Sequence, residues 1–165
     1  MAKGKHKKEE FDSTSLGWLC WQISNLWQRK IREALLPFEL THVQLMLLKA
    51  IDEFEQQGKS VTQIEVARKA QCDKMMASKV IRDLEKRKLI KRKPYHLDGR
   101  AMLIVATPEA KPLLESAIPS FEHANEQFFQ SLKGKQQRLE KRLQKLLNAN
   151  LSASFEDEEN DEEDL

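Results

Sequence analysis

The sequence predicts a mainly α-helical fold with one small β-hairpin, and three observations support this fold class. Apolar residues recur every three or four positions along most of the 165-residue chain, which is the period of helices with one buried face. The chain has only five Gly and five Pro, so few positions interrupt regular structure. Near residue 100, a basic run and an apolar run flank a turn sequence, which indicates a hairpin.

The first helix is predicted from about Ser15 to Leu36, ending before Pro37. Its apolar residues form one wide stripe: Leu16, Leu19, Cys20, Ile23, Leu26, Trp27, Ile31 and Leu35. Trp18 and Trp21 lie off this stripe and add a second apolar edge. Two apolar faces fit either core packing alone or a partner helix in a dimer.

The second helix is predicted to begin after an N-cap at Thr41 and to continue through Phe54, where a turn containing Gly58 follows. Its middle is almost entirely apolar, so we expect it to be the buried helix of the fold.

Two short helices about a turn follow, which is the pattern of a helix-turn-helix. Thr62 is the predicted cap of the first, with Glu65 in the capping-box position, and Asp73 caps the second. The buried stripe of the second is predicted to be Ala77, Val80, Ile81 and Leu84. The other face carries Lys74, Met75, Ser78, Lys79 and Arg82, with Met76 beside them. This is the layout of a recognition helix whose first residues enter the major groove of DNA.

The predicted hairpin, or wing, pairs a strand at 89–93, ended by Pro94, with an apolar strand at 101–106 across a turn. A helix capped by Thr107 is then expected to run to about Leu132 with a bend near Pro119, and a last helix follows Gly134.

Charge is concentrated on the helix-turn-helix and wing. Residues 68–100 contain twelve Lys or Arg against four Asp or Glu, although the whole chain carries only +2. A local excess on this motif indicates a phosphate-binding surface, and the alternative is an ordinary solvated face. Residues 156–164 hold eight acids in nine positions, and residues 1–12 are polar and Lys-rich, so both ends are predicted to be disordered.

The order of elements resembles the MarR family of dimeric winged-helix transcriptional regulators, over roughly residues 16–147. The resemblance depends on Leu40-Thr41, on the segment Leu84-Glu85-Lys86-Arg87-Lys88-Leu89-Ile90, on Asp98-Gly99-Arg100, and on Val105-Ala106-Thr107-Pro108-Glu109-Ala110. Lys88 and Ala110 stand where the family usually has Gly. Both departures concern the local backbone and leave the DNA surface unchanged.

The resemblance implies a homodimer whose terminal helices interleave and whose two lobes reach successive major grooves of a near-palindromic operator. The predicted organisation is a disordered basic N-terminus at 1–12, an N-terminal dimerisation helix at 13–38 and a winged helix-turn-helix lobe at 39–107. C-terminal dimerisation helices at 108–150 and a disordered acidic tail at 151–165 complete it.

Ten residues are predicted to contact double-stranded DNA: Lys74, Met75, Met76, Ser78, Lys79, Arg82, Arg92, Lys93, His96 and Arg100. Arg82 is expected to recognise guanine through a bidentate contact. Met75 and Met76 could lie against thymine methyls, or Met76 could pack into the core. Lys93 and its neighbours are either phosphate contacts or solvated strand residues. The resemblance implies that Arg100 enters the minor groove and that Asp98 orients it, the alternative being a structural salt bridge across the wing base.

Relatives of this family bind small aromatic ligands between the dimer helices and the lobe. Trp18, Trp21, Trp27 and His42 come from the elements that would line such a cleft, so a small aromatic effector is one hypothesis and simple packing is the other. Peroxide sensing is disfavoured because Cys20 and Cys72 are predicted to be core residues. The four His residues are scattered, so neither a metal site nor another cofactor is predicted.

The leading prediction is a sequence-specific DNA-binding repressor. The alternative is an interaction protein of the same fold, with weak or non-specific DNA binding, that works through its acidic tail and protein partners. An enzyme is not expected, because no nucleophile–base motif, phosphate-binding Gly loop or metal cluster occurs.

The sequence shows no signal-peptide or membrane-spanning segment, and two free thiols fit a reducing compartment, so we expect a cytoplasmic protein without a membrane partner.

Overall fold

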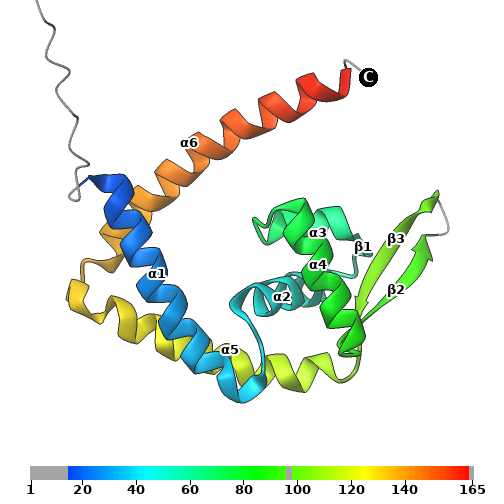
Figure 1. The fold of residues 1–165 in the computed structure, drawn as a ribbon, viewed down its shortest axis with the longest axis horizontal. Helices are drawn as coiled ribbons and strands as arrows, with labels where there is room; N and C mark the ends of the chain where they lie inside the picture. The colour runs from blue at the N-terminus through cyan, green and yellow to red at the C-terminus, as the bar shows by residue number, and fades with distance from the viewer. Residues whose placement is uncertain (1–14, 96–97, 164–165) are drawn as a thin grey trace, which may run out of the picture. The chain divides into compact units, whose positions relative to one another are not determined.

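A computed structural model describes residues 15–95 and 98–163, which divide into two compact units between Asn125 and Glu126. The first unit contains α1 (Leu16–Leu35), the 3-10 turn η1 (Leu36–Phe38), α2 (His42–Gln56), β1 (Val61–Thr62), α3 (Gln63–Lys69), α4 (Lys74–Lys86), β2 (Ile90–Tyr95), β3 (Asp98–Ala106) and most of α5 (Ala110–Phe129) (Figure 1). The second contains the end of α5, the turn η2 (Gln130–Leu132) and α6 (Gln136–Glu163). The predicted fold class, mainly helical with a small antiparallel sheet, is confirmed.

Three predicted N-caps of the first unit, Thr41, Thr62 and Asp73, are confirmed, and Ser15 caps α1 as well. The Ser15 side chain accepts a hydrogen bond from the backbone amide of Trp18. Thr41 and Thr62 each form a reciprocal capping box, with Gln44 and Glu65 respectively. These contacts satisfy amides that have no partner inside the helix, so the polar residue before each apolar run fixes where the helix begins.

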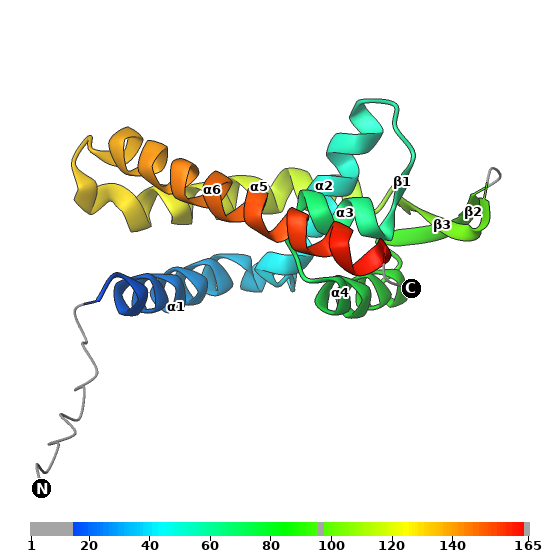
Figure 2. The ribbon, with the colours of Figure 1, turned by 90° about the horizontal axis from the view of Figure 1, so that it is seen from above.

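The core of the first unit gathers around α2, as predicted from its apolar middle. Buried side chains come from the end of α1, from α2, from α4, from the sheet and from α5; the largest are Ile31, Leu35, Leu45, Leu47, Leu48, Ile51, Ile81, Leu84, Ile90 and Ile104. Two views place α2 behind α3 and α4, with the β2–β3 hairpin projecting beyond them (Figures 1 and 2). The helix-turn-helix therefore packs on an apolar core.

The wing differs from the predicted hairpin in three respects. A third strand, β1, pairs with β3, so the sheet has three antiparallel strands in the order β1-β3-β2. Strand β2 continues past Pro94 to Tyr95 because β2 is an edge strand, where a residue without an amide proton can be accommodated. The register shifts between these two residues, and β3 begins at Asp98, three residues earlier than expected.

Three helices of the lobe end with a residue in the left-handed region: Gly58 after α2, Gln71 after α3 and Lys88 after α4. At the last of these, Lys88 donates to the Glu85 carbonyl at 2.9 Å and Leu89 donates to the Leu84 carbonyl at 3.0 Å. This pair of bonds is the Schellman motif. The φ of +60° at Lys88 explains physically why glycine suits this position, as the resemblance implied.

Helix α5 begins at Ala110, later than predicted, because Thr107 is buried and its hydroxyl donates to the Lys88 carbonyl at 2.7 Å. The helix continues through Pro119 to Phe129.

The prediction of a disordered acidic tail from residue 151 differs from the structure, in which α6 continues to Glu163. No Pro or Gly follows Gly134, and extending an existing helix adds one hydrogen bond for each residue fixed, so the backbone continues through the acidic segment.

Within the described residues, no single helix is long and apolar enough to cross a membrane. One pair bent by 70°, Leu16–Phe38 with His42–Gln56, has the length and composition to do so together.

Candidate nucleic-acid interface

Helix α4 is fixed in the lobe by its apolar face and by a polar cap. Ala77, Ile81 and Leu84 are completely buried beneath it. At its start, Oδ1 of Asp73 accepts hydrogen bonds from the amides of Met75 at 2.9 Å and Met76 at 3.0 Å. The cap and the buried stripe together determine which side chains of α4 face outward.

The outward face of α4 carries the predicted cations. Lys74, Lys79 and Arg82 are exposed, and none of them forms an ion pair within the part of the chain that the structure describes. Lys79 and Arg82 are three residues apart, so they lie on one side of the helix. The structure therefore presents free positive charge on the helix that the sequence identified.

Three other predicted residues of α4 lie on or beside this face. Ser78 is half-buried. Met75 is 83% exposed and Met76 is 50% exposed. Of the two interpretations left open for Met76, packing into the core is therefore wrong. We call Lys74, Met75, Met76, Ser78, Lys79 and Arg82 the α4 face.

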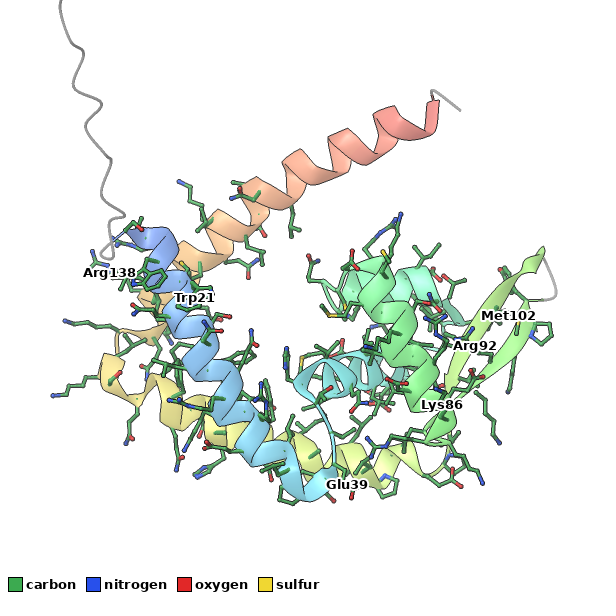
Figure 3. The ribbon with its side chains drawn as sticks, viewed as in Figure 1. Trp21, Glu39, Lys86, Arg92, Met102 and Arg138 are labelled. Atoms are coloured by element: carbon green, nitrogen blue, oxygen red, sulfur yellow. The ribbon has the colours of Figure 1, made fainter. Side chains whose placement is uncertain are left out.

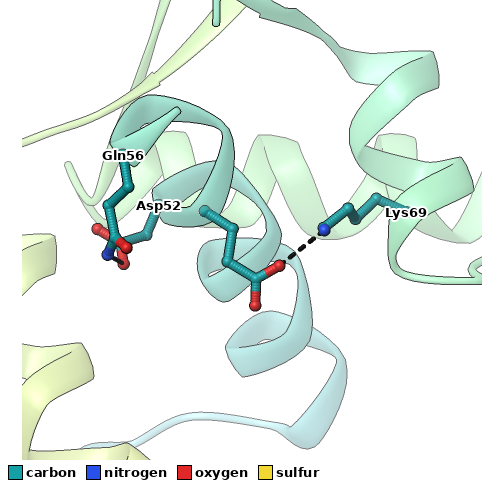
Figure 4. A network of polar contacts seen from close by, with 4 residues as sticks. Asp52, Gln56 and Lys69 are labelled. Carbon is teal, nitrogen blue, oxygen red and sulfur yellow. Dashed lines mark hydrogen bonds and ion pairs between the residues drawn. The ribbon is translucent and has the colours of Figure 1, made fainter. Parts of the chain in front are cut away.

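One lysine of α3 forms polar contacts with α2. The Nζ of Lys69 lies 2.8 Å from Oε2 of Glu53 (Figure 4). It also lies 5.6 Å from the ring centre of Phe54. Both partners lie on α2, so this cation supports the helix-turn-helix and is distinct from the free cations of the α4 face.

The remaining predicted residues belong to the wing, and they differ in their surroundings. Arg92 is turned toward α4, where its Nε lies 3.1 Å from Oε2 of Glu85, and its side chain is 28% exposed (Figure 3). Its Nη2 is buried without a hydrogen-bond partner among the described atoms. Lys93 is exposed. His96 lies outside the described residues, as do the side chains of Asp98 and Arg100, whose backbone belongs to β3.

Arg87, which the sequence reasoning did not select, connects the end of α4 to the α1–α2 connection. Its Nη1 donates to the Glu39 carbonyl at 2.6 Å, and weaker contacts at 3.5 Å reach the Phe38 carbonyl and Gln44 Oε1. A guanidinium suits this role because its planar group directs several donors at once. Arg87 lies inside the quoted segment 84–90, but its partners are 43 to 49 residues away, so no local pattern indicated them.

The four predicted ligand-lining residues fall into two groups. Trp18 and Trp21 stack near the start of α1 with ring centres 4.7 Å apart. Trp27 packs edge-on against His42, at 5.9 Å, and against Phe121, at 6.2 Å. The two groups are separated by about 1.7 turns of helix, or roughly 9 Å of rise from Trp21 to Trp27.

The Trp27 group is held by a hydrogen bond to α5, and its His42 imidazole has a lowered pKa. The indole Nε1 of Trp27 donates to Oδ1 of Asn125 at 2.9 Å. Burial, and secondarily the positive charge of Arg32, lowers the pKa of His42, so its imidazole favours the neutral form.

The cysteines differ in their surroundings. Cys20 is exposed, so its predicted place in the core is wrong: the stripe of α1 that contains it is buried only toward the helix end. Cys72 is half-buried, and burial, with a smaller effect of Asp73, raises the pKa of its thiol. No group of three His, Cys, Asp or Glu that could hold a metal ion occurs among residues 15–95 and 98–163.

Comparison with known proteins agrees with this geometry. The family model "MarR family" matches residues 40–102, which cover α2 to the wing. The HTH-type transcriptional regulator YdcH of Bacillus subtilis (strain 168) is 37% identical over 134 residues, covering 81% of this chain and 91% of the relative.

Solved structures share the fold. The S. aureus MepR–DNA complex is 25% identical with a TM-score of 0.73, covering 82% of this chain and 98% of that chain. The Bordetella bronchiseptica BpsR structure, which concerns regulation of DNA binding by 6-hydroxynicotinic acid, is 22% identical with a TM-score of 0.74, covering 84% and 96%. The chain belongs to the MarR family of transcriptional regulators.

Proposed function

We propose that this regulator binds double-stranded DNA sequence-specifically as a homodimer, acts as a repressor on a near-palindromic operator, and is released by a small aromatic acid. The observation that carries the DNA assignment is the α4 face, where three exposed cations without ion-pair partners among the described residues lie along the outward side of a capped helix. The MepR–DNA complex, which has the same fold, supports a duplex as the partner.

We expect the cations of the α4 face to contact different parts of the DNA. Arg82 lies one turn beyond Ser78, on the exposed side, and its guanidinium matches the two acceptors of guanine in the major groove. Lys79 carries a point charge on a flexible stem and suits a phosphate. Specificity is then concentrated in Arg82, and Lys79 contributes affinity for any duplex.

Replacing Arg82 by alanine separates specific from non-specific binding. On the operator, we expect a loss of about 1–3 kcal/mol, equivalent to roughly 5- to 150-fold in Kd, with relaxed preference at one base pair in each half-site. On random duplex the loss should be much smaller. Equal losses on both would contradict base recognition by Arg82 and would favour the interaction-protein alternative.

Exposed apolar faces on the terminal helices support the homodimer. On α1, the exposed large apolar side chains are Leu16, Leu19, Trp21, Ile23 and Leu26, and on α6 they are Leu143, Leu146 and Leu147. Apolar rows of this length are costly to leave in water, and a second copy can cover them symmetrically. Replacing Leu26 by glutamate should produce monomers in sedimentation experiments. The control Asn25→Glu, at an exposed position off the apolar stripe, should leave the dimer intact.

The Trp27–His42–Phe121 group supports an aromatic acid as effector. Its rings offer an apolar wall, and Arg32, close enough to influence His42, offers a positive charge for a carboxylate. With 6-hydroxynicotinic acid as the probe, we expect quenching of tryptophan fluorescence that Arg32→Gln weakens. No saturable quenching by this probe would contradict the assignment for this class of acid.

A further inference from the structure

The start of the recognition helix displays a highly exposed apolar side chain beside the cations of the α4 face. Met75 is the most exposed large apolar side chain among the described residues, at 83%. Met75, Lys79 and Arg82 are separated by steps of four and three, so they lie along one side of α4. Any surface that Lys79 and Arg82 contact together is therefore also within reach of Met75.

The first turn of α4 is poorly suited to a phosphate. The amides of Met75 and Met76, which would otherwise bind an anion, both donate to the Asp73 carboxylate. That carboxylate also places a negative charge at the helix start and repels the DNA backbone. The backbone of the first turn is thus unavailable to a phosphate, which leaves the exposed Lys74 side chain for the groove wall and Met75 for the base edges.

A methionine side chain can recognise only one kind of group on those edges. Its thioether has no donor and is a weak acceptor, so it cannot pair with the amino and carbonyl groups of the bases. The major groove presents one apolar group, the C5 methyl of thymine. The unbranched, polarisable side chain of methionine packs well against such a surface.

We infer that Met75 recognises the methyl group of a thymine in each operator half-site, with Met76 covering the flank of that contact. The inference rests on the proposed DNA-binding function and specifies its base preference. It predicts a thymine roughly three base pairs from the one that Arg82 reads, toward the beginning of α4, because seven residues of helix rise by about 10.5 Å and base pairs are about 3.4 Å apart. It also predicts that a cytosine methylated at C5 is tolerated better there than an unmethylated cytosine.

The experiment replaces single thymines of the selected operator by deoxyuridine, which lacks only the methyl group. Each duplex is titrated with full-length protein, and Kd is measured by fluorescence anisotropy at fixed salt. At one thymine in each half-site we expect about a fourfold loss, and about sixteenfold when both are replaced. This follows from the transfer free energy of about 0.8 kcal/mol for one buried carbon group.

Two variants test whether Met75 causes the loss. In Met75→Gln, which has a similar length but a polar end, the thymine and deoxyuridine duplexes should bind equally. Met75→Leu, which keeps an apolar end, should retain most of the preference. Lys79→Gln is the matched control on the same side of the helix: it should weaken every duplex and leave the thymine-to-deoxyuridine ratio unchanged.

The outcomes distinguish this inference from the proposed function. If no operator is selected from random DNA, sequence-specific binding itself fails. If an operator is selected but every deoxyuridine duplex binds within twofold of the parent, only the methyl contact is overturned. The same holds if Met75→Gln keeps the full deoxyuridine effect, because the methyl would then act through another residue or through DNA shape.

Discussion

Arg87 should contribute measurably to stability, because it joins the end of α4 to the α1–α2 connection. Its contact with the Glu39 carbonyl, at 2.6 Å, is a short hydrogen bond from a charged donor, a class that contributes about 1.5–3 kcal/mol. The contacts with the Phe38 carbonyl and Gln44 lie at 3.5 Å, the limit of effective hydrogen bonding. Since Arg87 is half-buried, water competes for these groups, and we expect about 1.5 kcal/mol in all.

The variant Arg87→Met removes the donors and keeps most of the apolar stem. Urea unfolding followed by circular dichroism, at one fixed protomer concentration, should show a decrease of about 1.5 kcal/mol in the free energy of unfolding. For a chain of this size, Tm should fall by about 3–6 °C. The free energy of unfolding of Arg87→Lys should lie between those of the unsubstituted protein and Arg87→Met, because one ammonium cannot replace the planar guanidinium group.

The matched control is Lys86→Met, one residue earlier. Lys86 is exposed and lies 3.9 Å from Asp83 within the same helix, a geometry that contributes about 0.3–0.5 kcal/mol. If Arg87→Met and Lys86→Met unfold within 0.5 kcal/mol of each other, the connection through Arg87 has no stabilising role and the reasoning is refuted.

Three further predictions use other features of the fold. Lys88→Gly should raise the free energy of unfolding in urea by about 1 kcal/mol, because it relieves a left-handed backbone in the Schellman turn; a decrease would contradict this. The pKa of His42 is lowered on folding, so the stabilising effect of the neutral imidazole is complete above the unfolded pKa and is lost as the pH falls through the folded value. His42→Gln should therefore reduce the pH dependence of the free energy of unfolding in urea between pH 7 and 5.5. An unchanged pH dependence would show that His42 does not cause it. Lys79→Gln should weaken binding to all duplexes and reduce the salt slope of log Kd by about 1 per protomer; an unchanged slope would remove Lys79 from the phosphate contacts.

The helices of the lobe were predictable because their signals are local. Thr41, Thr62 and Asp73 precede apolar runs and accept hydrogen bonds from amides two or three residues later, so sequence alone locates them. The outward side of α4 follows equally from helical period, because its opposite stripe is apolar. These two signals fixed the main candidate surface.

The features that escaped prediction depend on partners distant in sequence. Strand β1 has only two residues, and it exists because Val61 and Thr62 pair with Ile104 and Leu103 of β3. Arg92 looked like a phosphate contact beside Lys93, yet its side chain reaches Glu85 on α4. A run of cations does not reveal which of them meets a carboxylate from another element.

The acidic C-terminal segment concerns composition rather than contacts. Its charge density predicted disorder, and the backbone of α6 runs through it to Glu163. Composition describes how poorly a segment forms a core of its own, but it does not describe a helix that is already nucleated by the preceding residues.

The most direct test of sequence-specific recognition through the α4 face is the selection of operators from random duplex DNA with the purified full-length protein. Kd is then measured for the selected and the random duplexes across a range of salt concentrations. We predict one near-palindromic sequence with half-sites about one helical turn apart, bound at least 1,000-fold more tightly than random DNA at physiological salt. We also predict that Arg82→Ala removes most of that difference. Failure to enrich any sequence, with equal and weak binding to all duplexes, would contradict the assignment.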